Sequence, residues 1–153
     1  MSSVKIPEEL EKRLKNSPAD LKVAENFLKR ARKDLLSAKR ISSFDMEVAY
    51  TLLYDSMLRA GLAFMAVSGV RPEIVGKHKT VIGYMGYVLG KEYQDQVEFY
   101  DRMRKKRHFF IYEPGRYDCT EKEMQEAEKM ASEFLNIVAN KVRELHPQKE
   151  WEF

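Results

Sequence analysis

Residues 44–72, FDMEVAYTLLYDSMLRAGLAFMAVSGVRP, decide the fold class. Apolar and aromatic residues occupy more than one side of a helix drawn through residues 44–68, so we expect this segment to be the central and most enclosed helix. Gly69 and Pro72 predict where that helix ends. Glycine favours the conformation that terminates a helix, and the residue before a proline leaves helical space.

Further helices are predicted on both sides of this segment. An apolar stripe with three- and four-residue spacing begins at Leu21, and Ser17, Pro18 and Asp20 before it resemble an N-cap, a first-turn proline and the acidic member of a capping box. A second capping box, Thr120 to Glu123, predicts the start of the last helix. Pro147 predicts that this helix ends before residue 147. The predicted helices besides the central one cover residues 21–38, 78–89, 91–110 and 120–145.

The whole chain is predicted to be all-α. Its 153 residues, of which 44% are hydrophobic, are enough for one domain with its own core. No alternating strand pattern and no repeat is evident, so we expect an antiparallel bundle of four to five helices. The predicted organisation is an N-terminal arm or short charged helix at residues 1–16, the bundle at residues 17–146 and a C-terminal tail at residues 147–153.

The charge of the chain is segregated. Residues 29–40 carry six Lys/Arg against one Asp, and residues 102–108 carry five Lys/Arg and no acid. These two windows sum to +10 in a chain of net charge +3, which leaves −7 for the remainder. Such segregation indicates either an anionic partner, such as nucleic acid, or two solvated helix faces. With one cysteine, no secretory leader and no long apolar run, we expect a soluble cytoplasmic protein.

The second basic window, RMRKKRHFFIY at residues 102–112, lies on a predicted helix. A helix turns about 100° per residue, which places Arg104 and Arg107 on the same arc as the apolar residues that precede them. Arg102, Lys105 and Lys106 fall on the opposite side, where solvation accounts for them. Two arginines on a buried arc need negative partners, because an unpaired desolvated charge is strongly unfavourable.

The partner of these arginines is either internal or external. An internal partner would be an acid of a neighbouring helix, such as Asp55 or Asp45, and simple exposure at the helix end would remove the need for one. An external partner would be a phosphate, which the planar guanidinium group binds in a bidentate manner. Arg104 and Arg107 are therefore predicted phosphate-binding residues.

Two further side chains lie along the same edge. His108 follows Arg104 by four residues, and Tyr112 lies within about 80° of it. An imidazole titrates near neutral pH and can act as an acid or a base, whereas a phenol orients or donates. His78, near the start of another predicted helix, is expected to cap or close that helix.

These features resemble the HEPN domain family. The resemblance covers residues 21–145 and depends on a compact helical bundle and on a basic helix that ends in RKKRHFFIYEP, with GVRPEIVGKHKTVIGYM before it. The family motif is an arginine, a polar residue, a few intervening positions and a histidine. Two registers fit this sequence, and the preferred one takes Arg107 and His108 as the first two motif positions, with Tyr112 where the family has histidine. The other register pairs Arg102 with His108.

The resemblance implies an RNA- or nucleotide-binding protein. Many members are metal-independent endoribonucleases of the toxin type, and that chemistry would make Arg107, His108 and Tyr112 the catalytic residues, with Arg104 and Arg107 holding the phosphate. It also implies a homodimer and a nucleotidyltransferase-like antitoxin partner. The alternative is a non-catalytic helical module that pairs with itself or with such a partner. No metal or cofactor is expected, since the sequence lacks paired Glu-x-x-His motifs, a Cys/His zinc set and a glycine-rich phosphate loop.

Overall fold

The computed structural model describes residues 5–153 and shows one helical assembly with a small two-stranded antiparallel sheet. Most of the described chain is helical, and the long helices correspond to the segments predicted from the sequence. In chain order the elements are α1 (Glu8–Glu11), β1 (Leu14–Asn16), α2 (Leu21–Ile41), α3 (Met46–Ser68), β2 (Val70–Pro72), α4 (Lys77–Leu89), the 3-10 helix η1 (Lys91–Tyr93), α5 (Gln94–Tyr112) and α6 (Glu121–Leu145).

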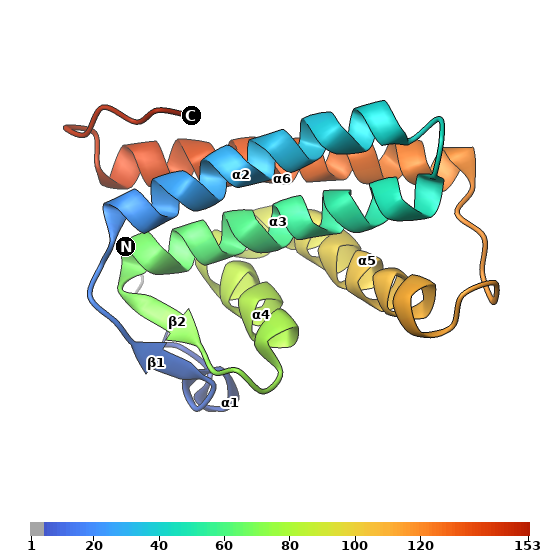
Figure 1. Cartoon of the computed structure of the whole chain (residues 1–153). Helices are drawn as coiled ribbons and strands as arrows, with labels where there is room; N and C mark the ends of the chain where they lie inside the picture. Colours follow the sequence, from blue (N-terminus) through green and yellow to red (C-terminus); the bar gives the residue numbers. More distant parts are fainter. Residues whose placement is uncertain (1–4) are drawn as a thin grey trace.

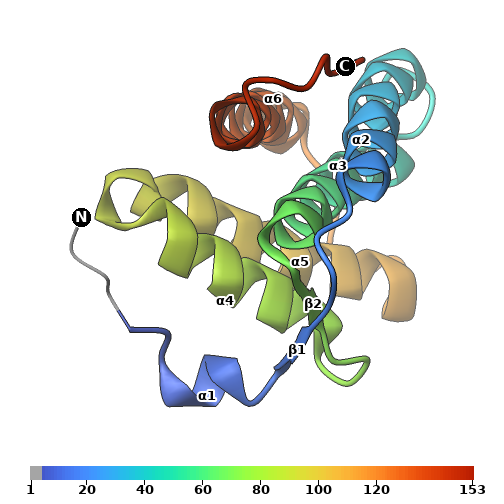
Figure 2. The same ribbon diagram turned by 90° about the vertical axis from the view of Figure 1, so that its left-hand side faces the viewer.

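Helix α3 occupies the centre, as predicted. It packs most extensively against α2 and α6, which run alongside it (Figure 1). The shorter helices α4 and α5 cross the other side of α3, so that Figure 2 shows α3 between α2 and α6 on one side and α4 and α5 on the other. This two-sided covering explains why the sequence of α3 is apolar on more than one face.

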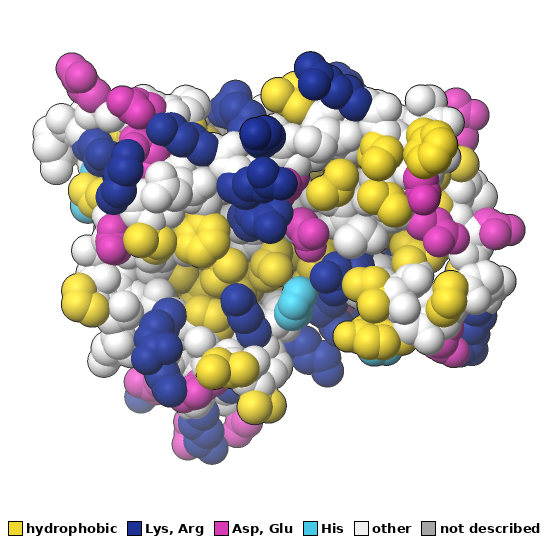
Figure 3. Space-filling view, in the orientation of Figure 1, with side chains coloured by type: hydrophobic (Ala, Val, Ile, Leu, Met, Phe, Trp, Pro, Cys, Tyr) yellow, Lys and Arg dark blue, Asp and Glu magenta, His cyan; other side chains and the backbone are white. Residues whose placement is uncertain are grey.

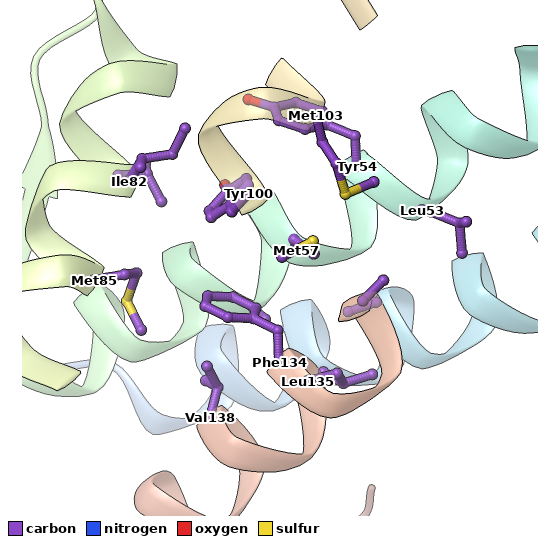
Figure 4. Close-up of a cluster of buried hydrophobic side chains, with 14 of the residues drawn as sticks. Leu53, Tyr54, Met57, Ile82, Met85, Tyr100, Met103, Phe134, Leu135 and Val138 are labelled. Carbon is purple, nitrogen blue, oxygen red and sulfur yellow. The ribbon is translucent and has the colours of Figure 1, made fainter. Parts of the chain in front are cut away.

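The core joins the two sides of α3. Tyr54 and Met57 of α3 meet Tyr100 of α5 and Phe134 of α6, and the ring centroids of Tyr100 and Phe134 lie 5.3 Å apart (Figure 4). All four side chains have no more than a trace of exposed surface. Each buried side chain of this size contributes roughly 2 kcal/mol through the hydrophobic effect, so this cluster holds α5 and α6 to α3.

Helix α3 lies close against α4 at Gly61. A Cβ atom added there would lie 2.5 Å from Cγ1 of Val81 in α4, closer than atoms can pack. Helix α4 has two glycines of its own, Gly83 and Gly86. At those positions an added Cβ would meet its nearest neighbour at 3.4 Å and 3.3 Å, so Gly61 is the tightest of the three.

Capping differs in part from the prediction. Asp20, not Ser17, is the N-cap of α2, and its side chain accepts a hydrogen bond from the backbone N–H of Val23 at 3.0 Å. Ser17 instead donates its backbone N–H to the carbonyl oxygen of Gly69 at 2.9 Å, which keeps residues before α2 extended beside the end of α3. The N-cap at Thr120 is confirmed, since its hydroxyl accepts from the N–H of Glu123 at 3.1 Å.

The two-stranded sheet was not predicted. Strands β1 and β2 are antiparallel, with Leu14 opposite Pro72 and Asn16 opposite Val70. Three-residue strands are too short to leave an alternating pattern, and their pairing depends on residues more than fifty positions apart in the chain. The segment before residue 17 therefore contains α1 and a strand that is tied to the body of the protein.

The C-terminal residues lie against the helices. Trp151 and Phe153 pack on the core, and Arg143 of α6 donates to the backbone oxygen of Phe153 at 2.8 Å. Lys29 of α2 also pairs with Glu152 at 2.9 Å. Across residues 5–153, none of the helices combines the length and apolar character that crossing a lipid bilayer requires.

Candidate functional site: a basic groove between α4 and α5

A groove of about 540 Å³ opens between the start of α4 and the C-terminal half of α5. Figure 3 shows Lys and Arg side chains around a histidine at the hollow between these helices. Five of the lining residues are Lys or Arg, two are His, and none is Asp or Glu. The lining residues are Arg13, Ile74, Gly76, Lys77, His78, Lys79, Arg104, Arg107, His108 and Tyr112.

Three separate parts of the chain bring these side chains together. Helix α5 supplies Arg104, Arg107, His108 and Tyr112, which share one edge because they are three, four and eight residues apart. The first turn of α4 supplies the residues at positions 77–79. The turn between α1 and β1 supplies Arg13, whose backbone oxygen accepts a hydrogen bond from the N–H of Glu73 at 2.9 Å.

Gly76 shapes the side of the groove formed by α4. Its φ of +71° lies in the left-handed region, which favours glycine, and an added Cβ would be 3.0 Å from Nη1 of Arg13. Helix α4 begins directly after Gly76, and no side chain caps it. The first-turn N–H groups of α4 lack intrahelical acceptors, so this helix end adds a partial positive charge to the groove.

Arg107 is incompletely paired. Its side chain is 25% exposed, and Nε lies 3.6 Å from Oδ1 of Asp55 in α3. That Nε atom is buried and donates to no hydrogen-bond acceptor among the described residues. The guanidinium group also lies over the ring of Tyr54, 5.2 Å from the ring centroid. The internal partner proposed at Asp55 is thus present, and it leaves hydrogen-bonding capacity on Arg107 unused.

Asp55 has its own electrostatic cost. Burial raises the pKa of Asp55, although the charges of Arg107 and Arg59 act in the opposite direction. The other proposed partner, Asp45, makes no such contact, because its side chain caps α3 by accepting from the N–H of Val48 at 3.1 Å.

Arg104 pairs within its own helix. Its side chain is 21% exposed, and Nε donates to Oδ1 of Asp101 at 3.0 Å. Lys105 also approaches Asp101, with Nζ 3.5 Å from Oδ2. Burial would raise the pKa of Asp101, but the hydrogen bond and charge of Arg104, together with Lys105, lower it overall. Asp101 therefore stays ionised and holds Arg104 in place.

His108 and Tyr112 lie at the rim of the groove. Both are exposed, and their ring centroids are 4.7 Å apart with the ring planes tilted by 45°. The structure thus brings together all four predicted site residues of the preferred register, with the arginines deeper and the imidazole and phenol outside. Arg102, the arginine of the other register, is absent from the groove and lies over the ring of Phe99.

The other cations of this helix also face away from the groove. Lys105 is exposed, as expected. Lys106 is half-buried rather than freely solvated, because it forms an ion pair with Glu123 of α6 and lies over the ring of Phe110. In the first basic window, Arg30 pairs with the fully buried Asp34 at 3.2 Å, and Arg59 pairs with the same carboxylate. These contacts account for part of that window without an external anion.

His78 was expected to cap or close α4, and this prediction is wrong, because the N-cap of α4 is Gly76 and no side chain caps the helix. The Nδ1 atom of His78 lies 2.6 Å from the hydroxyl of Tyr54, and the two rings are parallel within 8°. Burial lowers the pKa of His78, and the charges of Arg107, Lys77 and Arg104 lower it further. Burial also raises the pKa of Tyr54 well above its ordinary range. No sequence signal links positions 54 and 78, since their contact depends on how α3 and α4 pack.

No metal-binding group is evident. Within residues 5–153, no cluster of three or more His, Cys, Asp or Glu side chains could hold a metal ion. Cys119 is buried away from the groove, and burial raises the pKa of its thiol. The chemistry available in the groove is therefore that of guanidinium, ammonium, imidazole and phenol groups.

Comparison of the chain with protein-family models, with curated proteins and with solved structures finds no match.

Proposed function

We propose that this protein binds the phosphate groups of RNA or nucleotides in the basic groove. The observation that carries the proposal is the convergence of five Lys/Arg side chains and a helix N-terminus around one hollow that no carboxylate lines. Such a site attracts anions through both charge and directional N–H donors. The likeness of the α5 motif to the HEPN family supports phosphate of RNA or nucleotides as the ligand.

Arg104 and Arg107 serve different roles in this proposal. Arg104 is held by Asp101 and presents its remaining N–H donors to the groove. Arg107 is oriented by Asp55 and by the ring of Tyr54, and its side chain lines the groove, where the guanidinium group can approach a phosphate oxygen. A bound phosphate would give the two guanidinium groups a further negative partner besides Asp101 and Asp55.

Metal-independent cleavage of RNA is a second candidate function, favoured by the imidazole of His108 at the rim beside the two arginines. In that reaction the 2′-hydroxyl of RNA gives up its proton and its oxygen bonds to the adjacent phosphorus, the bond from phosphorus to the 5′-oxygen breaks, and the leaving oxygen takes a proton, which leaves a 2′,3′-cyclic phosphate. Arg104 and Arg107 would stabilise the developing negative charge, His108 would transfer a proton, and Tyr112 would orient the phosphate.

A homodimer through the end of α5 belongs to the same proposal. Ile111 and Tyr112 are 42% and 69% exposed there, which leaves apolar surface next to the groove. Light scattering across a concentration series tests this point, and a monomer at every concentration contradicts it. The rival function is a non-catalytic module whose groove docks a partner such as a nucleotidyltransferase-like protein.

RNA binding is tested with a labelled single-stranded oligonucleotide in the presence of a chelator. The Arg104→Ala variant should bind several-fold more weakly than the wild type and lose about 0.7 from the slope of log affinity against log salt. Lys105→Ala is the matched control, since Lys105 contacts the same Asp101 but does not line the groove. Equal losses in the two variants contradict a binding site in the groove.

Cleavage is tested by analysing the RNA products on a gel under the same conditions. We expect cleavage that disappears in Arg107→Ala and His108→Ala and persists in Lys105→Ala. Binding without cleavage by the wild type favours the non-catalytic function. Cleavage that both groove substitutions leave unchanged contradicts the assignment of these residues.

A further inference from the structure

The contact between Tyr54 and His78 defines the protonation of a groove side chain. Tyr54 is fully buried in α3, and the hydroxyl lies 2.6 Å from Nδ1 of His78 in the first turn of α4. Because burial raises the pKa of Tyr54, its hydroxyl keeps its proton at neutral pH. The nearby hydroxyl of Tyr100 keeps its own proton, because burial and then Tyr54 raise its pKa, so it can donate to Tyr54. With that arrangement Tyr54 donates to His78 and Nδ1 accepts.

A neutral imidazole carries its single proton on the nitrogen that does not accept. If Nδ1 accepts from Tyr54, the proton of His78 is on Nε2. Within residues 5–153 no hydrogen bond engages Nε2, and this atom is not among the buried polar atoms that lack a partner. Since His78 lines the groove, Nε2–H is open to whatever occupies it.

The surroundings of His78 oppose a second proton on the ring. Lys77 and Lys79 flank it on α4, Arg104 and Arg107 line the groove from α5, and Arg13 lines it from the turn before β1. The acid on α3 near this cluster, Asp55, is engaged with Arg107. Protonation would also make Nδ1 a donor, so the hydroxyl of Tyr54 would have to turn its proton away from His78.

We infer that His78 is a phosphate-binding residue whose Nε2–H, oriented by the hydroxyl of Tyr54, donates a hydrogen bond to an oxygen of the ligand. The inference rests on the proposed function, because it assigns a further contact to the ligand in the basic groove. Tyr54 acts as a positioning residue: it contacts His78 and Arg107 rather than the ligand.

A neutral donor has a signature that a cation lacks. Removing a Lys or Arg that contacts phosphate lowers the affinity and also the salt dependence, because fewer counterions are released on binding. Removing a neutral N–H donor lowers the affinity and leaves the salt dependence unchanged. A role of His78 in folding alone would change neither quantity in the folded variant.

The experiment compares His78→Ala, His78→Gln and Arg104→Ala with the wild type, using a labelled single-stranded RNA oligonucleotide at several salt concentrations. Loss of one hydrogen bond to a charged oxygen should weaken binding by His78→Ala about tenfold with the wild-type salt slope. His78→Gln, whose amide N–H can replace Nε2–H, should recover part of the affinity. Arg104→Ala should lose both affinity and slope.

Each other outcome separates the two proposals. Wild-type affinity in His78→Ala, with weakened binding in Arg104→Ala, overturns the role of His78 and leaves the proposed function intact. A reduced salt slope in His78→Ala shows a charged imidazole and also overturns the inference. No binding of RNA by the wild type at low salt overturns the proposed function and the inference with it.

The protonation of the free protein gives a readout that is independent of any ligand. Nitrogen NMR of the histidine rings should show His78 with a bare Nδ1 and a protonated Nε2 at neutral pH. Tyr54→Phe retains the aromatic ring and removes only the hydroxyl, so it should shift His78 toward a mixture of tautomers and weaken RNA binding several-fold. A protonated Nδ1 in the wild type contradicts the inference.

Discussion

Arg107 Nε lies 3.6 Å from Asp55 Oδ1, close enough for an ion pair and too far for a hydrogen bond. The pair holds the guanidinium group at the groove and leaves part of its hydrogen-bonding capacity free. Burial raises the pKa of Asp55, so this carboxylate is itself poorly solvated. A phosphate in the groove would add a second negative partner for the guanidinium group of Arg107.

Replacing Asp55 with Asn should therefore strengthen anion binding. The substitution removes the negative charge nearest Arg107 and keeps the shape of the side chain, so we expect RNA to bind about threefold more tightly at low salt. Glu150→Gln, which makes the same change of net charge in the exposed C-terminal segment, is the control. Equal affinities of Asp55→Asn and the wild type would contradict an active role of Arg107 in the groove.

Gly61 and Gly83 should respond in opposite directions to alanine. In Gly61→Ala the new Cβ would meet Val81 at 2.5 Å, so we expect a loss of about 1–3 kcal/mol in the free energy of unfolding. In Gly83→Ala the nearest atom is 3.4 Å away, and the better helix propensity of alanine should add about 0.5–1 kcal/mol. Urea unfolding of both variants measures these changes. Similar values for the two would contradict the packing of α3 on α4.

Asp34 should contribute to stability rather than to anion binding. It is fully buried and pairs with Arg30 of its own helix and with Arg59 of α3, and the second pair joins α2 to α3. Asp34→Ala leaves both arginines without this carboxylate and should lower the free energy of unfolding by about 2–4 kcal/mol. Asp118→Ala, at an exposed position, should change it by less than about 0.5 kcal/mol. A small effect of Asp34→Ala would show that the pair is unimportant for folding.

The stability of the protein should depend on pH through His78. Its pKa in the folded protein is below the ordinary value of 6.5, because of burial and then the charges of Arg107, Lys77 and Arg104. Between that lowered pKa and 6.5 the unfolded chain binds more protons than the folded chain, so stability falls as pH falls.

This prediction is measured by urea unfolding of the wild type and of His78→Gln at a series of pH values. All other titratable groups are common to the two proteins, so the difference between the two free energies isolates His78. The free energy of unfolding of the wild type should fall relative to that of His78→Gln as pH drops from 6.5 through the folded-state pKa of His78. Curves that stay parallel across this range would contradict a neutral, buried imidazole.

The sequence predicted the helices better than the contacts between them. Residues of α2 and α6 follow regular apolar spacing with capping residues at their beginnings, and α3 is apolar on more than one face, so local chemistry is sufficient to place these elements. The two-stranded sheet was not predicted, because each short strand forms only by pairing with the other, which is distant in the sequence. Asp20 replaced Ser17 as the N-cap for a similar reason, since Ser17 is engaged by the carbonyl of Gly69.

In the candidate site, too, residues of one helix could be predicted together, whereas residues brought in by tertiary contacts could not. Positions 104, 107, 108 and 112 could be grouped from helical spacing, because they belong to one helix. Arg13 and His78 reach the groove only through the two-stranded sheet and the packing of α4, and the bond between Tyr54 and His78 joins two helices. Tertiary contacts of this kind leave no periodic trace in the sequence.

The salt dependence of RNA binding tests the central claim most directly. For wild type, Arg104→Ala and Lys105→Ala, the slope of log affinity against log salt reports how many phosphate contacts each protein makes. The basic groove predicts a shallower slope and weaker binding in Arg104→Ala and wild-type behaviour in Lys105→Ala. Identical slopes for all three proteins, or no binding at low salt, would contradict it.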